Sequence, residues 1–366
     1  MKLETNTDQF LQAISVATRF VERRANLPVL GSVLMTAEKG GKVVLRATNL
    51  ECGVELSIPA KVTEEGVVAV SGATLSGFLG NAKSKNVSIS LEGEVLKVET
   101  ERAQASIKTI PHEDFPILPR VSATSSFSVK ASELHKALRS VVYCASTSTI
   151  KPELQSVLLF AEAGKLVAAA TDSFRLAEKT LALKNGGSIP NLLIPARNAA
   201  ELMRLLETSS GEVEVYYNEN QLSTHLGDVY YTSRLIDGAF PNYRQIIPSS
   251  FSTEAVVLRE DMSQALKSLS VFADKFSQVS FTIDPAKKAI LLASRNPDVG
   301  EQVSTLRATI SGDGFTLNFN GKYLADSLQA IVGDSVRIHS NGPGKPLLIK
   351  DAGDASFFYL AMPMNR

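Results

Sequence analysis

The stretch FLQAISVA, residues 10–17, is the first copy of the pattern that decides the fold. It recurs as LHKALRSV at 134–141 and as MSQALKSL at 262–269, each time with small or apolar residues at i, i+3, i+4 and i+7. That spacing lines one face of an α-helix. Three copies at similar separations predict a chain built from a repeated unit.

A second apolar helix pattern follows the first in every copy, and alternating strands follow both helices. In the first copy the strands read SVLMTA (32–37), KVVLRAT (42–48) and GVELSI (53–58). Paired strands directly after each helix are typical of the α+β class. We therefore predict a six-fold pseudo-repeat, in which each domain duplicates a strand-helix-strands motif and helices back antiparallel sheets.

Short polar joints mark the predicted domain boundaries. SATSS begins at residue 122 and PSSFST at residue 248, and both are rich in residues that favour loops. The predicted domains are 1–122, 123–250 and 251–366.

The charge balance limits the classes of partner. The 366 residues carry 38 Lys and Arg against 38 Asp and Glu, with no run of six like charges, which excludes a basic tail that binds nucleic acid by bulk attraction. The predicted helical windows 7–25, 72–85, 130–150, 194–207, 258–276 and 320–333 hold 14 basic and 9 acidic residues. This sorting suggests a surface that faces a polyanion, although a solvated helix face is the plain alternative.

Residue patterns that carry chemistry or membrane insertion are missing. The two cysteines and four histidines have no metal-ligand spacing, and GPGK at 342–345 lacks the spacing of a phosphate loop. We expect neither a metal, nor a cofactor, nor an enzymatic activity. No apolar run approaches about 18 residues, and MKLETNTDQF has no signal-peptide core, so we expect a cytoplasmic protein.

Six stretches along the whole chain resemble the bacterial sliding clamp, the beta subunit of DNA polymerase III. They are LPVLG (27–31), ATNLE (47–51), TDSFRLA (171–177), LIDGAFPNYRQIIP (235–248), RNP (295–297) and YLAMPM (359–364). The resemblance implies a head-to-tail homodimeric ring around duplex DNA, with helices inside and sheets outside. It also implies a processivity factor that tethers DNA polymerase III and other replication and repair proteins and is placed on DNA by a clamp loader.

Simple geometry agrees with a two-chain ring. A domain of about 122 residues has a diameter of roughly 35 Å as a sphere. Six touching spheres leave a hole of about 35 Å, whereas three leave about 5 Å. Because a DNA duplex is about 20 Å across, one chain cannot encircle it and two can.

The resemblance assigns a hydrophobic peptide-binding pocket, which family members use for Gln-Leu-x-Leu-Phe type segments. The matching residues are Leu154, Thr171, Ser173, Phe174, Arg175, Leu176, Pro241, Ile246, Leu360, Met362, Pro363 and Met364. Met and Pro walls suit extended peptides because thioethers repack around different anchors. The alternative is that these residues are ordinary core. Phe174 stands where His is frequent, and Asn365-Arg366 where Arg-Leu is common.

Two further residue sets follow. Contacts to DNA are expected from Arg24 and from the loop Thr149, Ile150, Lys151 and Pro152, with Lys83, Lys136, Arg139 and Arg197 as additional basic residues. The dimer interface is expected at Ile107 on an edge strand, at Val271 and Phe272 after a helix, and at the acidic Asp298 and Glu301. Lys83, Lys85 or Lys108 are the candidates for its basic side.

One alternative from another class stays open, a β-rich repeat scaffold or carbohydrate-binding protein without a DNA role. Carbohydrate sites usually present Trp or Tyr platforms. The chain has no Trp and eight Tyr, which gives this alternative little material.

Overall fold

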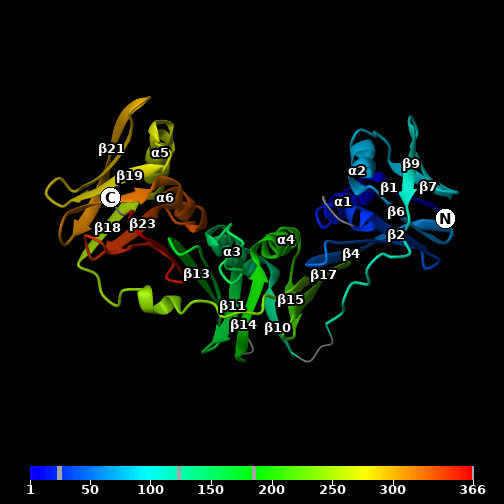
Figure 1. Ribbon diagram of the computed structural model, residues 1–366, viewed down its shortest axis with the longest axis horizontal. Coiled ribbons are helices and arrows are strands. Elements are labelled where there is room, and N and C mark those ends of the chain that lie inside the picture. Colours follow the sequence, from blue (N-terminus) through cyan, green and yellow to red (C-terminus); the bar gives the residue numbers. More distant parts are fainter. Residues whose placement is uncertain (23–26, 122–124, 184–186, 365–366) are drawn as a thin grey trace. The chain divides into compact units, whose positions relative to one another are not determined.

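The computed structural model describes residues 1–22, 27–121, 125–183 and 187–364. By its internal contacts the chain divides into two compact units, the first of Met1–Ala131 with Arg204–Leu235 and the second of Ser132–Met203 with Ile236–Arg366. The division into domains at 122 and 250 stays a prediction. Figure 1 shows the elements of both units.

The first unit is built on a 13-stranded sheet in the order β10-β15-β16-β17-β4-β3-β2-β6-β9-β8-β7-β1-β5. Helix α1 (Thr7–Thr18) packs against helix α2 (Gly72–Gly80) and against two strands of the sheet, β3 and β4. The strands are β1 (Lys2–Asn6), β2 (Val33–Glu38), β3 (Lys42–Thr48), β4 (Cys52–Pro59), β5 (Lys61–Glu64), β6 (Gly66–Val70), β7 (Asn86–Glu92), β8 (Val95–Glu99), β9 (Gln104–Ile110), β10 (Ser125–Lys130), β15 (Glu212–Tyr217), β16 (Gln221–Leu226) and β17 (Val229–Arg234).

The second unit is built on a 12-stranded sheet in the order β14-β11-β12-β13-β25-β24-β23-β18-β21-β20-β19-β22. The strands are β11 (Ser156–Glu162), β12 (Lys165–Thr171), β13 (Arg175–Ala182), β14 (Ile189–Pro195), β18 (Thr253–Leu258), β19 (Gln278–Asp284), β20 (Ala289–Asn296), β21 (Gly300–Ser311), β22 (Phe315–Asn320), β23 (Ser335–Ser340), β24 (Leu347–Asp351) and β25 (Phe357–Ala361). The helices are α3 (Ala131–Val141), α4 (Ala196–Glu207), whose last turn belongs to the first unit, α5 (Arg259–Leu269) and α6 (Gly321–Ser327). Helices α5 and α6 pack against each other.

Every strand pair in both sheets is antiparallel, which confirms the predicted α+β class. Strand β3 has the bounds of the predicted KVVLRAT segment. Among the described residues, no helix is long and apolar enough to cross a membrane.

The repeated apolar stripes form the buried faces of three helices. Phe10, Ala13, Ile14 and Ala17 of α1 are all buried, as are their counterparts in α3 and α5. Asn6 caps α1, because its side-chain oxygen accepts the Gln9 backbone N–H at 3.0 Å. Burying a large apolar side chain such as Phe10 stabilises the fold by about 1.5–3 kcal/mol. The i, i+3, i+4 and i+7 spacing in the sequence therefore correctly predicts the buried face of each of these three helices.

Helix α4 ends at Glu207, the last residue of its predicted window, whereas the other five helices end earlier than predicted. Helices α3, α5 and α6 are each followed by a 3-10 turn, at Val142–Cys144, Ser270–Phe272 and Leu328–Ala330. Helix α2 ends at Gly80, so Lys83 and Lys85 lie in the segment before β7 and not on a helix, which corrects the prediction. The last turn tightens because i→i+3 bonds satisfy carbonyl groups that have no α-helical partner.

Two strand pairs of the same kind join segments that are far apart in the chain. In the first unit β4 pairs with β17, with Val54 opposite Tyr231. In the second unit β13 pairs with β25, with Ala177 opposite Tyr359. In both, the third strand after one repeated helix meets the last strand of the following predicted domain. We call these pairs the first joint and the second joint.

Candidate functional site

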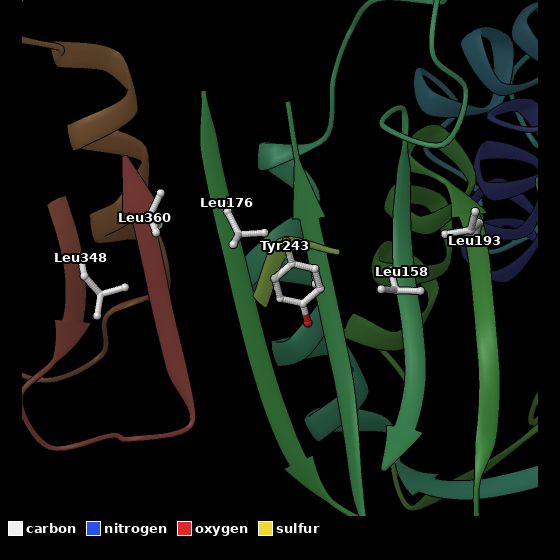
Figure 2. Close-up of a cluster of buried hydrophobic side chains, with 7 residues drawn as sticks. Leu158, Leu176, Leu193, Tyr243, Leu348 and Leu360 are labelled. Carbon is white, nitrogen blue, oxygen red and sulfur yellow. The ribbon is translucent and has the colours of Figure 1, made fainter. Parts of the chain in front are cut away.

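The predicted pocket residues surround a buried apolar cluster in the second unit. The cluster comprises Leu158, Ala169, Leu176, Leu193, Tyr243, Leu348 and Leu360. Figure 2 shows Leu176 on β13 and Leu360 on β25, which lie opposite each other in the second joint. Both leucines are fully buried, so these two pocket residues belong to the core beneath the site.

The segment that follows the first unit's last strand is anchored on this cluster by Tyr243. Its ring packs within the cluster, and its hydroxyl donates a hydrogen bond to the buried Glu178 on β13. Burial raises the pKa of Tyr243 above its ordinary value, so the hydroxyl stays protonated as a donor. This anchor fixes the neighbouring Pro241 and Ile246, and the Ile246 side chain is 50% exposed.

The turn between β12 and β13 is a tightly bonded loop of predicted pocket residues. The Thr171 hydroxyl donates to the Arg175 carbonyl at 2.6 Å, and both Phe174 N–H and Arg175 N–H donate to Asp172 Oδ1, at 2.9 and 3.0 Å. Ser173 has a φ of 77°, a left-handed conformation that non-glycine residues rarely adopt. The turn thereby holds the Phe174 side chain 63% exposed.

The segment after β25 lies against this turn. Met362 N–H donates to the Phe174 carbonyl at 2.8 Å, and Met364 N–H donates to the Asn318 carbonyl of β22 at 2.8 Å. The Met362 side chain is 37% exposed. Phe174, Ile246 and Met362 are the large exposed apolar members of the predicted pocket set, and we call these three residues the rim.

The structure sorts the predicted pocket residues into rim and support. Leu154 and Thr171 are buried, and Pro363 and Met364 are half-buried. Arg175 is held in a polar network of its own, described below. Burial works to lower the pKa of Arg175, but the nearby Tyr359, Cys144 and Asp326 hold it above its ordinary value, so its charge is permanent.

The predicted DNA-contacting residues that the structure describes are all exposed. Lys136 and Arg139 lie three residues apart on α3, which places them on one helix face. Arg197 is on α4, Thr149 and Lys151 are in the segment before β11, and Lys83 follows α2. Arg24 lies outside the described residues. Solvated surface charges are exposed in the same way, so the contacts of these residues to DNA stay a prediction.

Two strands have partly open edges where the dimer interface is predicted. Strand β9 pairs with β8 through Gln104–Lys108 but with β6 only at Thr109 and Ile110. Strand β21 pairs with β20 through Gly300–Arg307 but with β18 only from Ala308 onward. In the described structure the backbone groups of 104–108 and 301–307 therefore lack a second partner strand, an arrangement that invites strand pairing.

Apolar side chains are exposed beside the open edge of β21. Val271, Val299 and Val303 are 67%, 57% and 61% exposed. Phe272 is half-buried against Gly300, whose added Cβ would lie 3.7 Å from the ring. The predicted Asp298, in the turn before this strand, and Glu301, near its start, are both exposed, whereas Ile107 on β9 is only 7% exposed.

Each joint is completed by an aromatic residue that follows a repeated helix. In the first joint Phe20, after α1, packs edge-on against Tyr231 with ring centroids 6.1 Å apart. In the second joint Tyr143, after α3, stacks on Tyr359 at 6.3 Å. The equivalent position after α5 is occupied by Val271 and Phe272. The sequence analysis did not predict these aromatic contacts. The signal for them was the aromatic residue that follows each repeated apolar helix pattern.

A separate cavity of about 470 Å³ lies in the first unit, and none of the predicted site residues lines it. Its walls come from α1, the end of β4, the segment from the end of α4 into β15, and the end of β16 with the turn that follows it; they include Gln12, Ile58 and His225. Among the described residues no group of three or more His, Cys, Asp or Glu side chains is placed to hold a metal ion.

Comparison with known proteins places these features in a family. Models of the N-terminal, central and C-terminal domains of the DNA polymerase III beta subunit match residues 1–119, 128–242 and 244–365. A beta sliding clamp of Synechococcus elongatus is 28% identical over 100% of this chain and 99% of its own length.

Solved structures show the same fold over the whole chain. The DNA polymerase III beta subunit of Thermotoga maritima superimposes with a TM-score of 0.93 at 25% identity, covering 100% of this chain and 99% of its own. A sliding clamp of Bartonella birtlesii, solved with griselimycin bound, gives a TM-score of 0.92 at 27% identity and covers 100% of both chains.

Proposed function

Since the chain belongs to the bacterial sliding clamp family, the beta subunits of DNA polymerase III, we propose that two copies close a ring around duplex DNA and tether a DNA polymerase through the Phe174–Met362 rim. The observation that carries this function is the pair of open edges on β9 and β21. The three family models, with limits near the polar joints, support the domain division 1–122, 123–250 and 251–366.

The two joints within the chain specify how the open edges pair. Each joint couples the third strand of one domain to the last strand of the next, β4 with β17 and β13 with β25. Strand β21 is the third strand after the repeated helix of the C-terminal domain and β9 is the last strand of the N-terminal domain, and neither has such a partner within the described part of the chain. A C-terminal domain therefore pairs head-to-tail with the N-terminal domain of a second copy, and two such contacts close the ring.

The register follows from the same equivalence. Directly opposite residues on three neighbouring strands form a row across the sheet. Tyr231 is the third residue of the row that starts at Val215, and Tyr359 is the third residue of the row that starts at Ile338. In the N-terminal domain the matching row starts at Ile89, and its third residue is Ala105. The joint partners of the two tyrosines are Val54 and Ala177, whose counterpart on β21 is Gln302. Ala105 thus lies opposite Gln302, Ser106 opposite Glu301 and Ile107 opposite Gly300, with Phe272 beside them.

A cross-chain disulfide tests this register. Ala105→Cys with Gln302→Cys is expected to give a covalent dimer under mild oxidation, because directly opposite residues have Cβ atoms about 4.5–5.5 Å apart. The matched control, Ala105→Cys with Ser304→Cys, is two residues out of register. The native Cys52 and Cys144 are both buried, so they interfere little. Equal cross-linking of both pairs would reject the register, and light scattering that finds only monomers would reject the ring.

Enclosure explains how a chain without net charge can hold DNA. With equal numbers of acidic and basic residues, phosphate contacts from Lys136, Arg139, Lys151 and Arg197 are few and fix no position along the duplex. We expect rings placed by a clamp loader to remain on closed circular DNA at raised salt and to run off after the circle is cut. Equal loss from circular and linear DNA would mean simple electrostatic binding.

The apolar rim is the attachment point for partner proteins. An extended peptide with Leu and Phe anchors matches the exposed Phe174, Ile246 and Met362. The Bartonella birtlesii clamp was solved with griselimycin, so griselimycin is a useful competitor. We expect it to displace a fluorescent Gln-Leu-x-Leu-Phe peptide from this chain, and binding of both together would separate the two sites.

The clamp itself supplies no chemical step. It needs neither metal nor cofactor, because processivity comes from topology and the polymerase performs the reaction. As a replication factor we place it in the cytoplasm with the bacterial chromosome. The alternative of a carbohydrate-binding or scaffold protein is not favoured, because all three family models describe DNA polymerase III beta domains.

A further inference from the structure

The Arg175 guanidinium of the proposed pocket donates three hydrogen bonds within the protein, one from each nitrogen. Its Nε donates to Asp172 Oδ2 at 2.9 Å, one terminal nitrogen donates to Asp326 Oδ2 at 2.6 Å, and the other donates to the Tyr143 carbonyl at 2.6 Å. The side chain is only 12% exposed. Each of the three nitrogens thus has a protein acceptor, so Arg175 ties the turn to Asp326 and to the Tyr143 backbone.

The far end of this tie is helix α6. Tyr323, one turn before Asp326, lies under the guanidinium with its ring centroid 4.3 Å from the Arg175 carbon. Asn320 caps the start of the helix by accepting Lys322 N–H at 2.9 Å. Beyond its end, Asp351 accepts the N–H groups of Val332 and Gly333 at 3.1 and 2.8 Å. Helix α6 is therefore fixed at both ends and provides a rigid support.

The second wall of the pocket rests on the same corner. Strand β22 leads directly into α6, and its Asn318 carbonyl holds Met364. Met362 is bonded in turn to Phe174, next to Arg175. The β12–β13 turn, the C-terminal segment and the β22–α6 corner thus form a closed loop of contacts.

We propose that Asp326, with Tyr323, is a positioning residue of the peptide pocket: through Arg175 it holds the 171–175 turn, and therefore Phe174, at the distance from Met362 that a peptide anchor needs. This inference rests on the proposed pocket and adds a residue that does not line it. A ring and an ion pair on one guanidinium define both its plane and its position. Removing the Asp326 carboxylate breaks the bond between Arg175 and helix α6, while the hydrogen bonds within the 171–175 turn remain.

The chain offers a matched control at the other end of β13. Lys179 Nζ donates to Asp354 Oδ2 at 2.6 Å, and like Arg175 it is 12% exposed. Both ion pairs join β13 to the C-terminal part of the chain, yet the Lys179 pair lies four residues farther along the strand. Loss of either should cost comparable stability, and only loss of the Asp326 pair should change the pocket.

The first measurement is the affinity for a labelled Gln-Leu-x-Leu-Phe peptide by fluorescence anisotropy on the full-length dimer. We expect Asp326→Asn to weaken binding about tenfold, since a hydrogen-bonded charge pair typically contributes on the order of a factor of ten. Asp354→Asn should stay within about twofold. An unchanged affinity in Asp326→Asn, or equal losses in both variants, overturns the positioning role.

The second measurement reports the turn without any peptide. The chain has no tryptophan, so Phe174→Trp places a single tryptophan on the turn, and its fluorescence can be excited selectively beside the eight tyrosines. In this background we expect Asp326→Asn to lower the tryptophan anisotropy and raise its quenching by acrylamide, whereas Asp354→Asn leaves both unchanged. A general loss of stability would not separate the two variants in this way below their unfolding transition.

The two proposals fail separately. If the unsubstituted chain binds no peptide, the pocket assignment fails, and the tryptophan reporter still decides whether Asp326 holds the turn. If peptide binds and the reporter does not respond to Asp326→Asn, the pocket stands and the positioning role falls.

Discussion

The first and second joints have nearly the same backbone and different side chains. In the turn before β4, the Thr48 hydroxyl donates to the Cys52 carbonyl, Asn49 Oδ1 accepts two N–H groups, and Leu50 has a φ of 71°. The turn before β13 repeats this with Thr171, Asp172 and Ser173. The turn is therefore a property of the repeated unit and not of the pocket.

Arg234, the last residue of β17, and Met362, which follows β25, are also bonded alike. Arg234 N–H donates to the Glu51 carbonyl at 2.8 Å, as Met362 N–H donates to the Phe174 carbonyl at 2.8 Å. In the first joint the two side chains form an ion pair of 3.6 Å, whereas in the second they are both apolar and exposed. The same backbone arrangement thus carries a surface ion pair in the first joint and the proposed apolar binding surface in the second joint.

The largest effect is expected from removing the apolar half of the second joint. Deletion of 362–366 should reduce affinity for the Gln-Leu-x-Leu-Phe peptide more than about a hundredfold, because a short peptide concentrates its binding free energy in a few anchors. The fold should survive, since the β25 ladder ends at Ala361. Anisotropy and light scattering on the same sample check both claims. Full affinity would reject the pocket, and loss of the dimer would make the terminus structural.

The next effect concerns the open joint, where Phe272 takes the place that aromatics fill in the two closed joints. Phe272→Ala should weaken the dimer by about 2–4 kcal/mol, as expected for a buried interface aromatic. Sedimentation equilibrium measures the dissociation constant. Ile150→Ala, an exposed apolar residue before β11, is the control. A dissociation constant that does not change would place the interface elsewhere.

A smaller effect is expected when the side chains of the first joint are transplanted to the second. Phe174→Glu with Met362→Arg should weaken peptide binding by about 2 kcal/mol, roughly thirtyfold. The joint should remain stable within about 0.5 kcal/mol, because both positions are exposed. Glu51→Phe with Arg234→Met, made at the first joint, should leave peptide affinity unchanged. Peptide binding that tolerates the Phe174 and Met362 changes would show that the rim is misassigned.

The smallest effect is expected from Glu55, whose carboxylate stabilises the first joint. Glu55 on β4 accepts hydrogen bonds from Arg46 at 2.6 Å and Arg120 at 2.7 Å. Burial works to raise the pKa of Glu55, but the two arginines outweigh it and hold that pKa below its ordinary 4.5. Its contribution is then present above pH 4.5 and is lost as the pH falls toward the lowered pKa.

Glu55→Gln should therefore destabilise the chain by about 1 kcal/mol at neutral pH. The difference from the unsubstituted protein should shrink below pH 4.5, where Glu55 becomes protonated in the unfolded chain first. Urea unfolding at a series of pH values measures this. A difference that grows toward acid pH would mean that the carboxylate is not stabilised by the arginines.

The sequence predicted the elements well because their signals are local. The stripe of Phe10 and Ile14 marks a buried helix face, and the alternation in KVVLRAT gives the bounds of β3. Helix ends were missed, as Lys83 shows, because a final 3-10 turn or a cap is a matter of a few hydrogen bonds that apolar spacing does not encode. Roles of pocket residues such as Phe174 came from resemblance and stay predictions.

What the sequence determined by itself is the repeat, the strand and helix pattern and the family, all of which are recorded in spacing along the chain. Only the tertiary structure decided that β9 and β21 have open edges, and that Asp326 meets Arg175 across 151 residues. Such contacts depend on which surfaces the packed sheets bring together. A side chain 151 residues away leaves no periodic signal in a single sequence, because the physical interaction exists only after the chain has folded.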